Sequence, residues 1–341
     1  MRLGVVAALL LACGAEWACG EQNTLERVRA AGVLRCGVDV AQAEYTTEDA
    51  HGNRAAFDAD LCRAVATAVL GDGAKTGIKG FPDDVALMAA LRAGDVDLAP
   101  TLADDFTHSV GTQLALTRPV LWDGVGFLVP GASGVVRAGQ LSGKKVCFLA
   151  DTAVEETVRG WFARERLDFV PFPFQEEGEM EAAFSTGNCA ALAGERTRLA
   201  ETRAVFLEHG RRTRLLAEVV SEEPLSAAVR EDDRHWLAIV SWVIEALVGA
   251  EESGITKANA RELAGAGKEG DSERRFWLGG SKQVGSGLGL DDGWVVRVIA
   301  AVGNYGEIYE RDLGSGSAMK LPRGTNGLRR DGGVLMALPG R

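Results

Sequence analysis

The feature that most constrains the fold of this chain is a strand followed by a helix, each carrying a cysteine, between Val33 and Val65. Residues 33–38 form a short apolar run that predicts a β-strand. After a polar loop, apolar residues recur at helical spacing and predict a helix that starts near Phe57; they are Phe57, Leu61, Ala64, Val65 and Ala68. A bridge between Cys36 and Cys62 would join the strand to the helix as the first β-α unit of an α/β domain. Such a domain predicts a ligand site in the loops at the carboxyl ends of the strands.

Length and charge narrow the class of protein. The chain has 341 residues, enough for two domains with separate cores. Its composition, 46% hydrophobic and 25% charged, is that of a globular protein. The formal net charge of −11 repels nucleic acid and anionic lipid, and no basic tract offsets it. We therefore expect no nucleic-acid partner.

Residues 1–20 have the features of an export signal. Arg2 is followed by a short apolar run over residues 3–12, too short to span a bilayer. Two cleavage sites compete. The triplet Ala18-Cys19-Gly20 would leave a mature chain that begins near Glu21, whereas residues 10–13 resemble a lipoprotein box that would lipidate Cys13. We expect export to the periplasm with soluble release, and keep the lipid anchor as the alternative.

Four cysteines remain after such a signal: Cys36, Cys62, Cys147 and Cys189. An even number in an exported chain predicts disulfides. Of the three possible pairings we expect Cys36–Cys62 and Cys147–Cys189, because each pair then lies inside one proposed domain. The alternative is buried free thiols. A metal site is not expected, because no pair has CxxC spacing and no histidine clusters with them.

The pattern along the chain predicts two α/β halves. In the first, strands at 75–80 and 96–99 flank a helix that Pro82 opens, and a long polar loop at 100–120 is a candidate functional loop. A crossing strand follows at 126–129. The second half has strands at 145–149, 169–172, 189–193 and 215–220 with helices between them, then a long helix at 232–252 and three helices at 256–263, 272–277 and 291–313. Two lobes joined by two crossing strands would close on a ligand by hinge motion.

The chain resembles the extracytoplasmic solute-binding proteins of polar amino-acid ABC transporters, and within them the general L-amino-acid-binding subgroup. The segments that carry the resemblance include VRAAGVLRCGVD (28–39), ALRAGDVDL (90–98), RPVLWDGVGFLV (118–129), SEEPLSAAVR (221–230) and GNYGEIYERDLG (303–314). The resemblance covers nearly everything after residue 24. It implies a periplasmic-binding-protein fold of type II, with two α/β lobes, a two-strand hinge and an extra helical C-terminal extension.

The resemblance also implies the domain limits and the partners. We expect lobe 1 to comprise residues 24–125 and 222–341 with the extension, and lobe 2 to comprise residues 126–221. A protein of this family binds a small amino-acid-like molecule as a monomer and delivers it to an inner-membrane ABC permease. It uses no cofactor, and the chain contains no GxSxG, HExxH or P-loop motif that would indicate an enzyme.

In this family an arginine after the third strand binds the ligand carboxylate, a threonine at a helix start assists it, and an aspartate binds the ammonium. Counting from Asp97 or from Arg118 places Ser109 at the arginine position. The helix-start turn is Asp151-Thr152-Ala153, and the ammonium-binding residue is Glu195, which keeps the charge on a longer side chain. Loss of one partner of a buried charged hydrogen bond costs about 3–5 kcal/mol, so we do not expect ordinary tight binding of neutral amino acids.

Further candidate ligand-binding residues lie near these positions. Tyr45 would form an apolar wall or lie at the surface, and Thr101 would offer a polar group at a strand end. His108 could donate a charged hydrogen bond, or belong to a solvated turn. Asp104 and Asp105 could face the ligand or cap a turn. Asp151 is expected to be the N-cap of the helix that follows it.

Three hypotheses remain open for the function. The chain is a binding protein with a changed ligand, such as a cationic amine without a free carboxylate. Alternatively, the site has decayed and the chain is a non-binding or signalling paralogue. The least favoured hypothesis is an enzyme on the same fold, similar to the periplasmic dehydratases related to this family, because those also keep the carboxylate-binding arginine.

Overall fold

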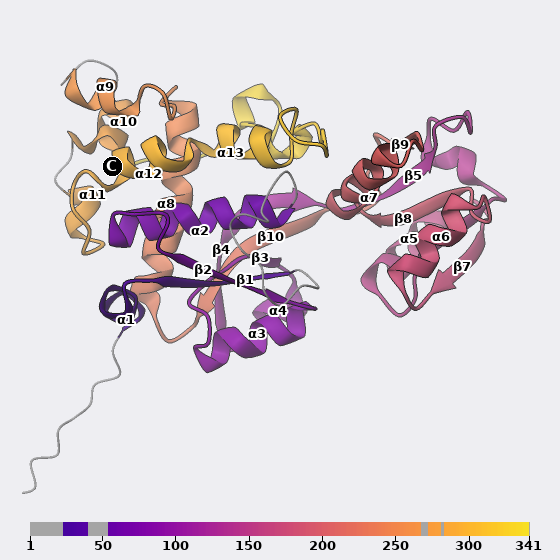
Figure 1. Ribbon diagram of the computed structural model, residues 1–341, viewed down its shortest axis with the longest axis horizontal. Coiled ribbons are helices and arrows are strands. Elements are labelled where there is room, and N and C mark those ends of the chain that lie inside the picture. Colours follow the sequence, from indigo (N-terminus) through magenta and orange to yellow (C-terminus); the bar gives the residue numbers. More distant parts are fainter. Residues whose placement is uncertain (1–22, 40–53, 267–271, 281–282, 341) are drawn as a thin grey trace, which may run out of the picture.

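The structure is a computed structural model that describes residues 23–39, 54–266, 272–280 and 283–340. Figure 1 shows a larger and a smaller lobe at opposite ends of the long axis, joined by long strands. No helix in the described ranges has the length and apolar character of a bilayer-spanning segment. The expected signal segment 1–20 and Tyr45 lie outside the described residues.

The larger lobe, here lobe 1, contains two small sheets. The first pairs β1 (Leu34–Asp39) with β2 (Thr76–Phe81) in parallel. The second is antiparallel, in the order β3 (Ala99–Ala103), β10 (Glu223–Arg230), β4 (Leu114–Asp123). A parallel bridge between Cys36 and Leu98 connects the sheets, and the Gly37 N–H donates to the Leu98 carbonyl at 2.9 Å. Because β1 and β3 run in the same direction, their carboxyl ends lie at one edge of lobe 1.

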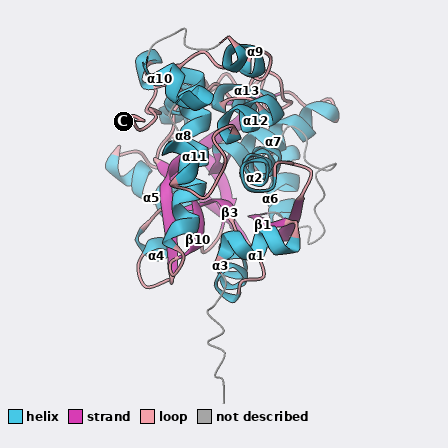
Figure 2. Ribbon diagram, turned by 90° about the vertical axis from the view of Figure 1, so that its left-hand side faces the viewer, coloured by secondary structure: helices cyan, strands magenta, loops and turns pink. Residues whose placement is uncertain are grey.

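Helices cover both faces of these sheets. They are α1 (Thr24–Ala31), α2 (Arg54–Leu70), α3 (Asp84–Ala93) and α8 (Arg234–Glu252). In Figure 2, α2 and α8 lie above the strands and α3 lies below them. The start of α3 is fixed locally, since the Asp83 side chain accepts from the Ala86 N–H at 2.8 Å. The Cys36–Cys62 disulfide joins β1 to α2.

The smaller lobe, here lobe 2, has one sheet of five strands in the order β7-β6-β8-β5-β9. The strands are β5 (Val125–Pro130), β6 (Lys145–Leu149), β7 (Val170–Phe174), β8 (Ala191–Glu195) and β9 (Thr213–Leu215). β6 is parallel to β7 and β8, and each of the three leads into a helix: α5 (Ala153–Arg164), α6 (Glu177–Ser185) and α7 (Arg196–Glu208). The second disulfide, Cys147–Cys189, lies in this lobe. Both disulfides have the expected pairing.

The C-terminal extension packs on lobe 1. It contains α9 (Ala260–Gly265), α10 (Ser272–Arg275), α11 (Gln283–Ser286), α12 (Trp294–Val302) and α13 (Tyr305–Asp312). α12 packs against α2, and the buried Tyr305 hydroxyl donates to the Val120 carbonyl at 2.8 Å. The single helix predicted over 291–313 is wrong. Asn304 and Glu307 form a capping box that starts a new helix after Gly303.

The hinge brings two chain crossings into close contact. β4 passes into β5 through Gly124, and the chain returns to lobe 1 at Ser221, just before β10. A Cβ atom on Gly124 would lie 2.3 Å from the Ser221 carbonyl oxygen, so only glycine fits this approach. The Val125 N–H donates to the Ser221 hydroxyl at 2.8 Å. The two crossings therefore support each other.

One loop prediction and one strand prediction near the hinge are wrong. The loop expected over 100–120 contains β3, the short helix α4 (Phe106–Ser109) and most of β4. β4 includes Pro119, which cannot donate a ladder hydrogen bond, and its pairing with β10 shifts register beside that proline. The strand expected over 215–220 ends at Leu215, and the returning strand is β10.

Candidate ligand site between the lobes

The edge of lobe 2 that carries the site is formed by the carboxyl ends of β6, β7 and β8. Thr152 follows β6 and caps α5: its hydroxyl donates to the Leu149 carbonyl at 2.8 Å and accepts from the Glu155 N–H at 3.3 Å. Glu195 ends β8 and directly precedes α7. β6 and β8 are neighbours in the sheet, so these two predicted site residues lie on adjacent strand ends.

The structure corrects the role expected for Asp151. The N-cap of α5 is Thr152, and Asp151 lies one residue earlier with a φ of 58°, in the left-handed region. Its N–H donates to the Glu155 carboxylate at 3.0 Å, while its side chain is exposed. Hydrogen bonds from the Arg159 side chain and from the Asp151 backbone lower the pKa of Glu155. This acid therefore remains ionised beside the start of α5.

The edge of lobe 1 that follows β3 has polar groups that bond to their own lobe. The buried Thr101 hydroxyl donates to both carboxylate oxygens of Asp58, at 2.8 and 3.0 Å. Asp104 accepts from the Ser226 hydroxyl of β10 at 2.7 Å. Asp104 directly follows β3, but Thr101, expected at a strand end, lies in the middle of β3 and is buried. Both help to hold β3 to its surroundings.

The remaining lobe 1 candidates belong to α4. Asp105 caps this short helix and accepts from the His108 N–H at 2.9 Å. The His108 ring contacts Asp105 at 2.8 Å and Asp84 at 3.5 Å. The Ser109 hydroxyl donates to the Asp105 carbonyl at 2.5 Å. Partial burial raises the pKa of Asp105, but the hydrogen bonds from His108 outweigh burial and lower this pKa overall. At the position that the family resemblance assigns to arginine, the serine hydroxyl is thus used locally.

Sequence reasoning missed one charged residue at the lobe 2 edge, Arg198 in the first turn of α7. Its side chain is 48% exposed, and its Nε lies 3.8 Å from Glu177 at the start of α6. A second contact, from Nη1 to Glu201, is 3.5 Å long. α6 and α7 pack on the same face of the sheet, so the contact with Glu177 joins the first turns of two neighbouring helices at the lobe 2 edge. The sequence signal was an arginine three residues after a strand-end acid.

The electrostatic surroundings of Arg198 include both lobes. Burial lowers the pKa of this guanidinium, but Glu201, Glu177, Asp39 and Glu195 together raise it above its ordinary value. Asp39 is the last residue of β1 in lobe 1. The field of Asp39 therefore acts on a group at the edge of lobe 2, which indicates that the two strand-end edges face each other.

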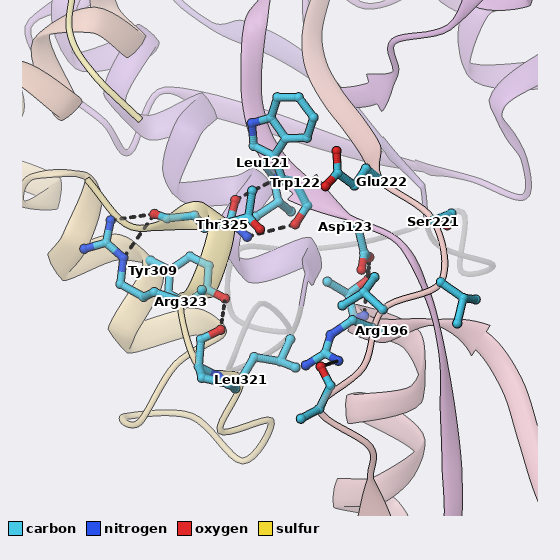
Figure 3. A pocket seen from close by; sticks show the side chains of 17 residues that line it. Leu121, Trp122, Asp123, Arg196, Ser221, Glu222, Tyr309, Leu321, Arg323 and Thr325 are labelled. Carbon is cyan, nitrogen blue, oxygen red and sulfur yellow. Dashed lines mark hydrogen bonds between the residues drawn. The ribbon is translucent and has the colours of Figure 1, made fainter. Parts of the chain in front are cut away.

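A separate pocket of about 430 Å³ lies at the hinge, between lobe 2 and the C-terminal extension (Figure 3). None of the predicted site residues lines it. Its polar groups bond to one another or to the backbone: Arg196 donates to the Leu216 carbonyl at 2.9 Å, and the Thr197 hydroxyl donates to Asp123 at 2.5 Å. The pocket is therefore part of the joint between hinge and extension.

No protein-family model matches the chain. The General L-amino acid-binding periplasmic protein AapJ of Rhizobium johnstonii is 37% identical over 341 residues, covering 98% of this chain and 97% of AapJ. The Glutamate/glutamine/aspartate/asparagine-binding protein BztA of Rhodobacter capsulatus is 35% identical over 341 residues, covering 99% of this chain and 98% of BztA.

A solved structure supports the same relationship. An ABC transporter periplasmic binding protein from Brucella ovis with glutathione bound has a TM-score of 0.78 and 32% sequence identity. The match covers 94% of this chain and 100% of that protein. Sequence and fold thus agree over almost the full length, and the chain belongs to the family of periplasmic amino-acid-binding proteins of ABC transporters.

Proposed function

We propose that this chain is the periplasmic solute-binding component of an amino-acid-type ABC importer, and that it binds a small polar, amino-acid-like ligand between its lobes. The observation that carries the proposal is the full-length relationship to AapJ, at 37% identity over 98% of the chain. The proposal includes the lobe limits, with residues 24–125 and 222–341 in lobe 1 and residues 126–221 in lobe 2. A monomer would then deliver the ligand to an inner-membrane permease.

The geometry supports a hinged closure. The crossings at Gly124 and Ser221 are the short chain connections between the lobes, about which the lobes could rotate. α7 of lobe 2 also contacts the extension, since Arg203 donates to the Met319 carbonyl, so closure would have to preserve or break that contact. Closure would bring the ends of β1 and β3 toward the ends of β6 and β8. The carboxylate of Glu195 would then receive the ligand ammonium, and the N–H groups at the start of α5 would face the ligand.

The carboxylate-binding part of the site is altered. Ser109 stands in place of the family arginine, and its hydroxyl donates to the Asp105 carbonyl. Tyr45, Thr101, Asp104, His108 and Thr152 complete the proposed binding set. A desolvated ligand carboxylate needs a fixed counter-group, and Ser109 supplies none.

A thermal-shift screen tests the proposed function. The panel contains the twenty protein amino acids, glutathione, polyamines and small cations, each at millimolar concentration. A ligand at 100 times its Kd stabilises the native state by about 2.7 kcal/mol, so at least one compound should raise Tm by several degrees. If no compound raises Tm, the protein is a non-binding or signalling paralogue. Turnover of a compound that raises Tm would instead indicate an enzyme of the dehydratase type.

The proposal extends to the amino terminus and to catalysis. AapJ is periplasmic by name, and we propose export of this chain with soluble release; lipidation of Cys13 is the alternative. Mass spectrometry of the protein released from the periplasm distinguishes a terminus near Glu21 from an acylated cysteine. We also propose that the chain acts without a cofactor and is not an enzyme, because the family relationship is to binding proteins.

A further inference from the structure

We infer that Arg198 of lobe 2 binds the carboxylate of the ligand, in the role that lobe 1 has lost at Ser109. The inference rests on the proposed function and deepens it, since it assigns the ligand to the amino acids with a free carboxylate. In this assignment the fixed positive charge of the site lies on lobe 2 instead of lobe 1.

The position of Arg198 carries the first step of the argument. α7 starts directly after β8, so its first turn lies at the lobe 2 edge that faces the end of β1. The side chain extends toward Glu177 at the start of α6. α6 and α7 pack side by side on one face of the sheet, so the guanidinium lies between the first turns of these two helices.

The weak internal pairing of Arg198 carries the second step. Its contacts to Glu177 and Glu201 are 3.8 and 3.5 Å long, beyond the 2.7–2.9 Å of a strong charged hydrogen bond. No shorter contact from this side chain to an acceptor occurs among the described residues. Arg196, two residues earlier, instead donates to a backbone carbonyl at 2.9 Å. The N–H groups of Arg198 therefore remain available to a bidentate acceptor.

The neighbouring acid carries the third step. An α-amino acid holds its ammonium and its carboxylate on one carbon atom, so the two receiving groups must lie side by side. Glu195 ends β8 and is the N-cap of α7, and Arg198 lies three residues later in the first turn of that helix, so both side chains start from the same strand-to-helix junction. One acid and one base at this spacing match a zwitterion. A cation without a carboxylate would bind Glu195 but would be repelled by the positive charge of Arg198.

Isothermal titration with matched probes tests the inference. Each amino acid that stabilises the wild type is compared with the amine that lacks its carboxylate, for example L-arginine with agmatine or L-leucine with isoamylamine. In Arg198→Gln the affinity for the amino acid should fall at least about 30-fold, while the weaker affinity for the amine should not fall. Arg198→Lys, which keeps the charge without the planar guanidinium, should lose less. Arg164→Gln, an exposed arginine in the last turn of α5, is the matched control and should bind like the wild type.

The outcomes separate this inference from the proposed function. Equal binding of the amino acid by Arg198→Gln and wild type would overturn the inference and leave the proposed function intact. Tighter binding of the amines than of the amino acids by the wild type would also overturn it, in favour of a carboxylate-free cation. Binding of no probe at all would overturn both. The thermal unfolding of Arg198→Gln without ligand shows that the variant is folded, since the side chain is half exposed.

Discussion

The two lobes treat charged groups in opposite ways. Lobe 1 buries carboxylates that are paired within the same lobe: Asp97 accepts from Arg27 and Arg35 at 2.8 and 2.7 Å, and Asp58 accepts from Thr101. Buried Asp123 at the end of β4 instead accepts from Thr197 of lobe 2. Among residues 126–221, all of which the structure describes, no carboxylate is fully buried. Its charged groups stay partly exposed at the strand-end edge.

This difference explains how a site can change without loss of the fold. In lobe 1 the polar groups after β3 are bonded to neighbours in the same lobe, so a ligand would have to displace those contacts. In lobe 2 the contacts of Arg198 are long, and a ligand carboxylate would replace them at small cost. In the proposed site, the two groups that bind the ligand's ammonium and carboxylate, Glu195 and Arg198, therefore both belong to lobe 2.

The largest expected effect comes from the disulfides, which should stabilise both lobes to a similar degree. The loops that they close have sequence separations of 26 and 42 residues. Chain entropy predicts that removal of the first or the second disulfide lowers the free energy of unfolding by about 3.5 or about 4 kcal/mol. Urea unfolding of Cys36→Ser/Cys62→Ser and of Cys147→Ser/Cys189→Ser measures them. A large loss in only one variant would show that the lobes depend on their bridges unequally.

The next effect concerns the self-paired edge of lobe 1. Thr101→Val removes the hydroxyl that donates to Asp58 and should lower the free energy of unfolding by about 1–3 kcal/mol. Thr101→Ser keeps the hydroxyl and should lose clearly less. Urea unfolding of both variants checks this. Wild-type stability in Thr101→Val would show that the buried contact contributes nothing and would weaken the contrast between the lobes.

A buried acid in the extension, which packs on lobe 1, should make the free energy of unfolding depend on pH. Burial, together with the neighbouring Asp60, raises the pKa of Asp312 in the extension to about 7. The unfolded chain has an aspartate pKa of about 3.9, so the folded state binds a proton more strongly. The resulting stability is present below about pH 4 and is lost as pH rises through 7, by at most about 1.4 kcal/mol per pH unit.

Asp312→Asn tests this dependence, because asparagine cannot ionise. The difference in unfolding free energy between variant and wild type should shift in favour of the variant as pH rises from 4 to 8. The measurement is urea unfolding at several pH values. An unchanged difference over this range would mean that Asp312 is ionised throughout.

The smallest expected effect is a partial recovery of ligand affinity when an arginine is placed in lobe 1. In an Arg198→Gln background, Ser109→Arg places a guanidinium at the family position and should recover about tenfold of the lost affinity, about 1.4 kcal/mol. Recovery is expected to be incomplete because α4 is held by its contacts among Asp105, His108 and Asp84. Isothermal titration with the same amino acid measures it, and Ser109→Gln is the uncharged control.

The sequence predicted the repeated β-α order, both disulfide pairs and the family, because those depend on local periodicity and on residue strings. It did not predict β4 or β10, whose pairing is between segments more than one hundred residues apart and includes Pro119. Arg198 was missed for a similar reason. Its contact with Glu177 of α6 depends on tertiary packing, which the local sequence does not show.

The most direct test of the account is a crystal structure with a bound amino acid that the thermal-shift screen identifies. We predict that the carboxylate of that ligand accepts two hydrogen bonds from the Arg198 guanidinium, at about 2.7–2.9 Å, with the ammonium on Glu195. A carboxylate bound by groups of lobe 1, with Arg198 still directed at Glu177 and Glu201, would contradict the account.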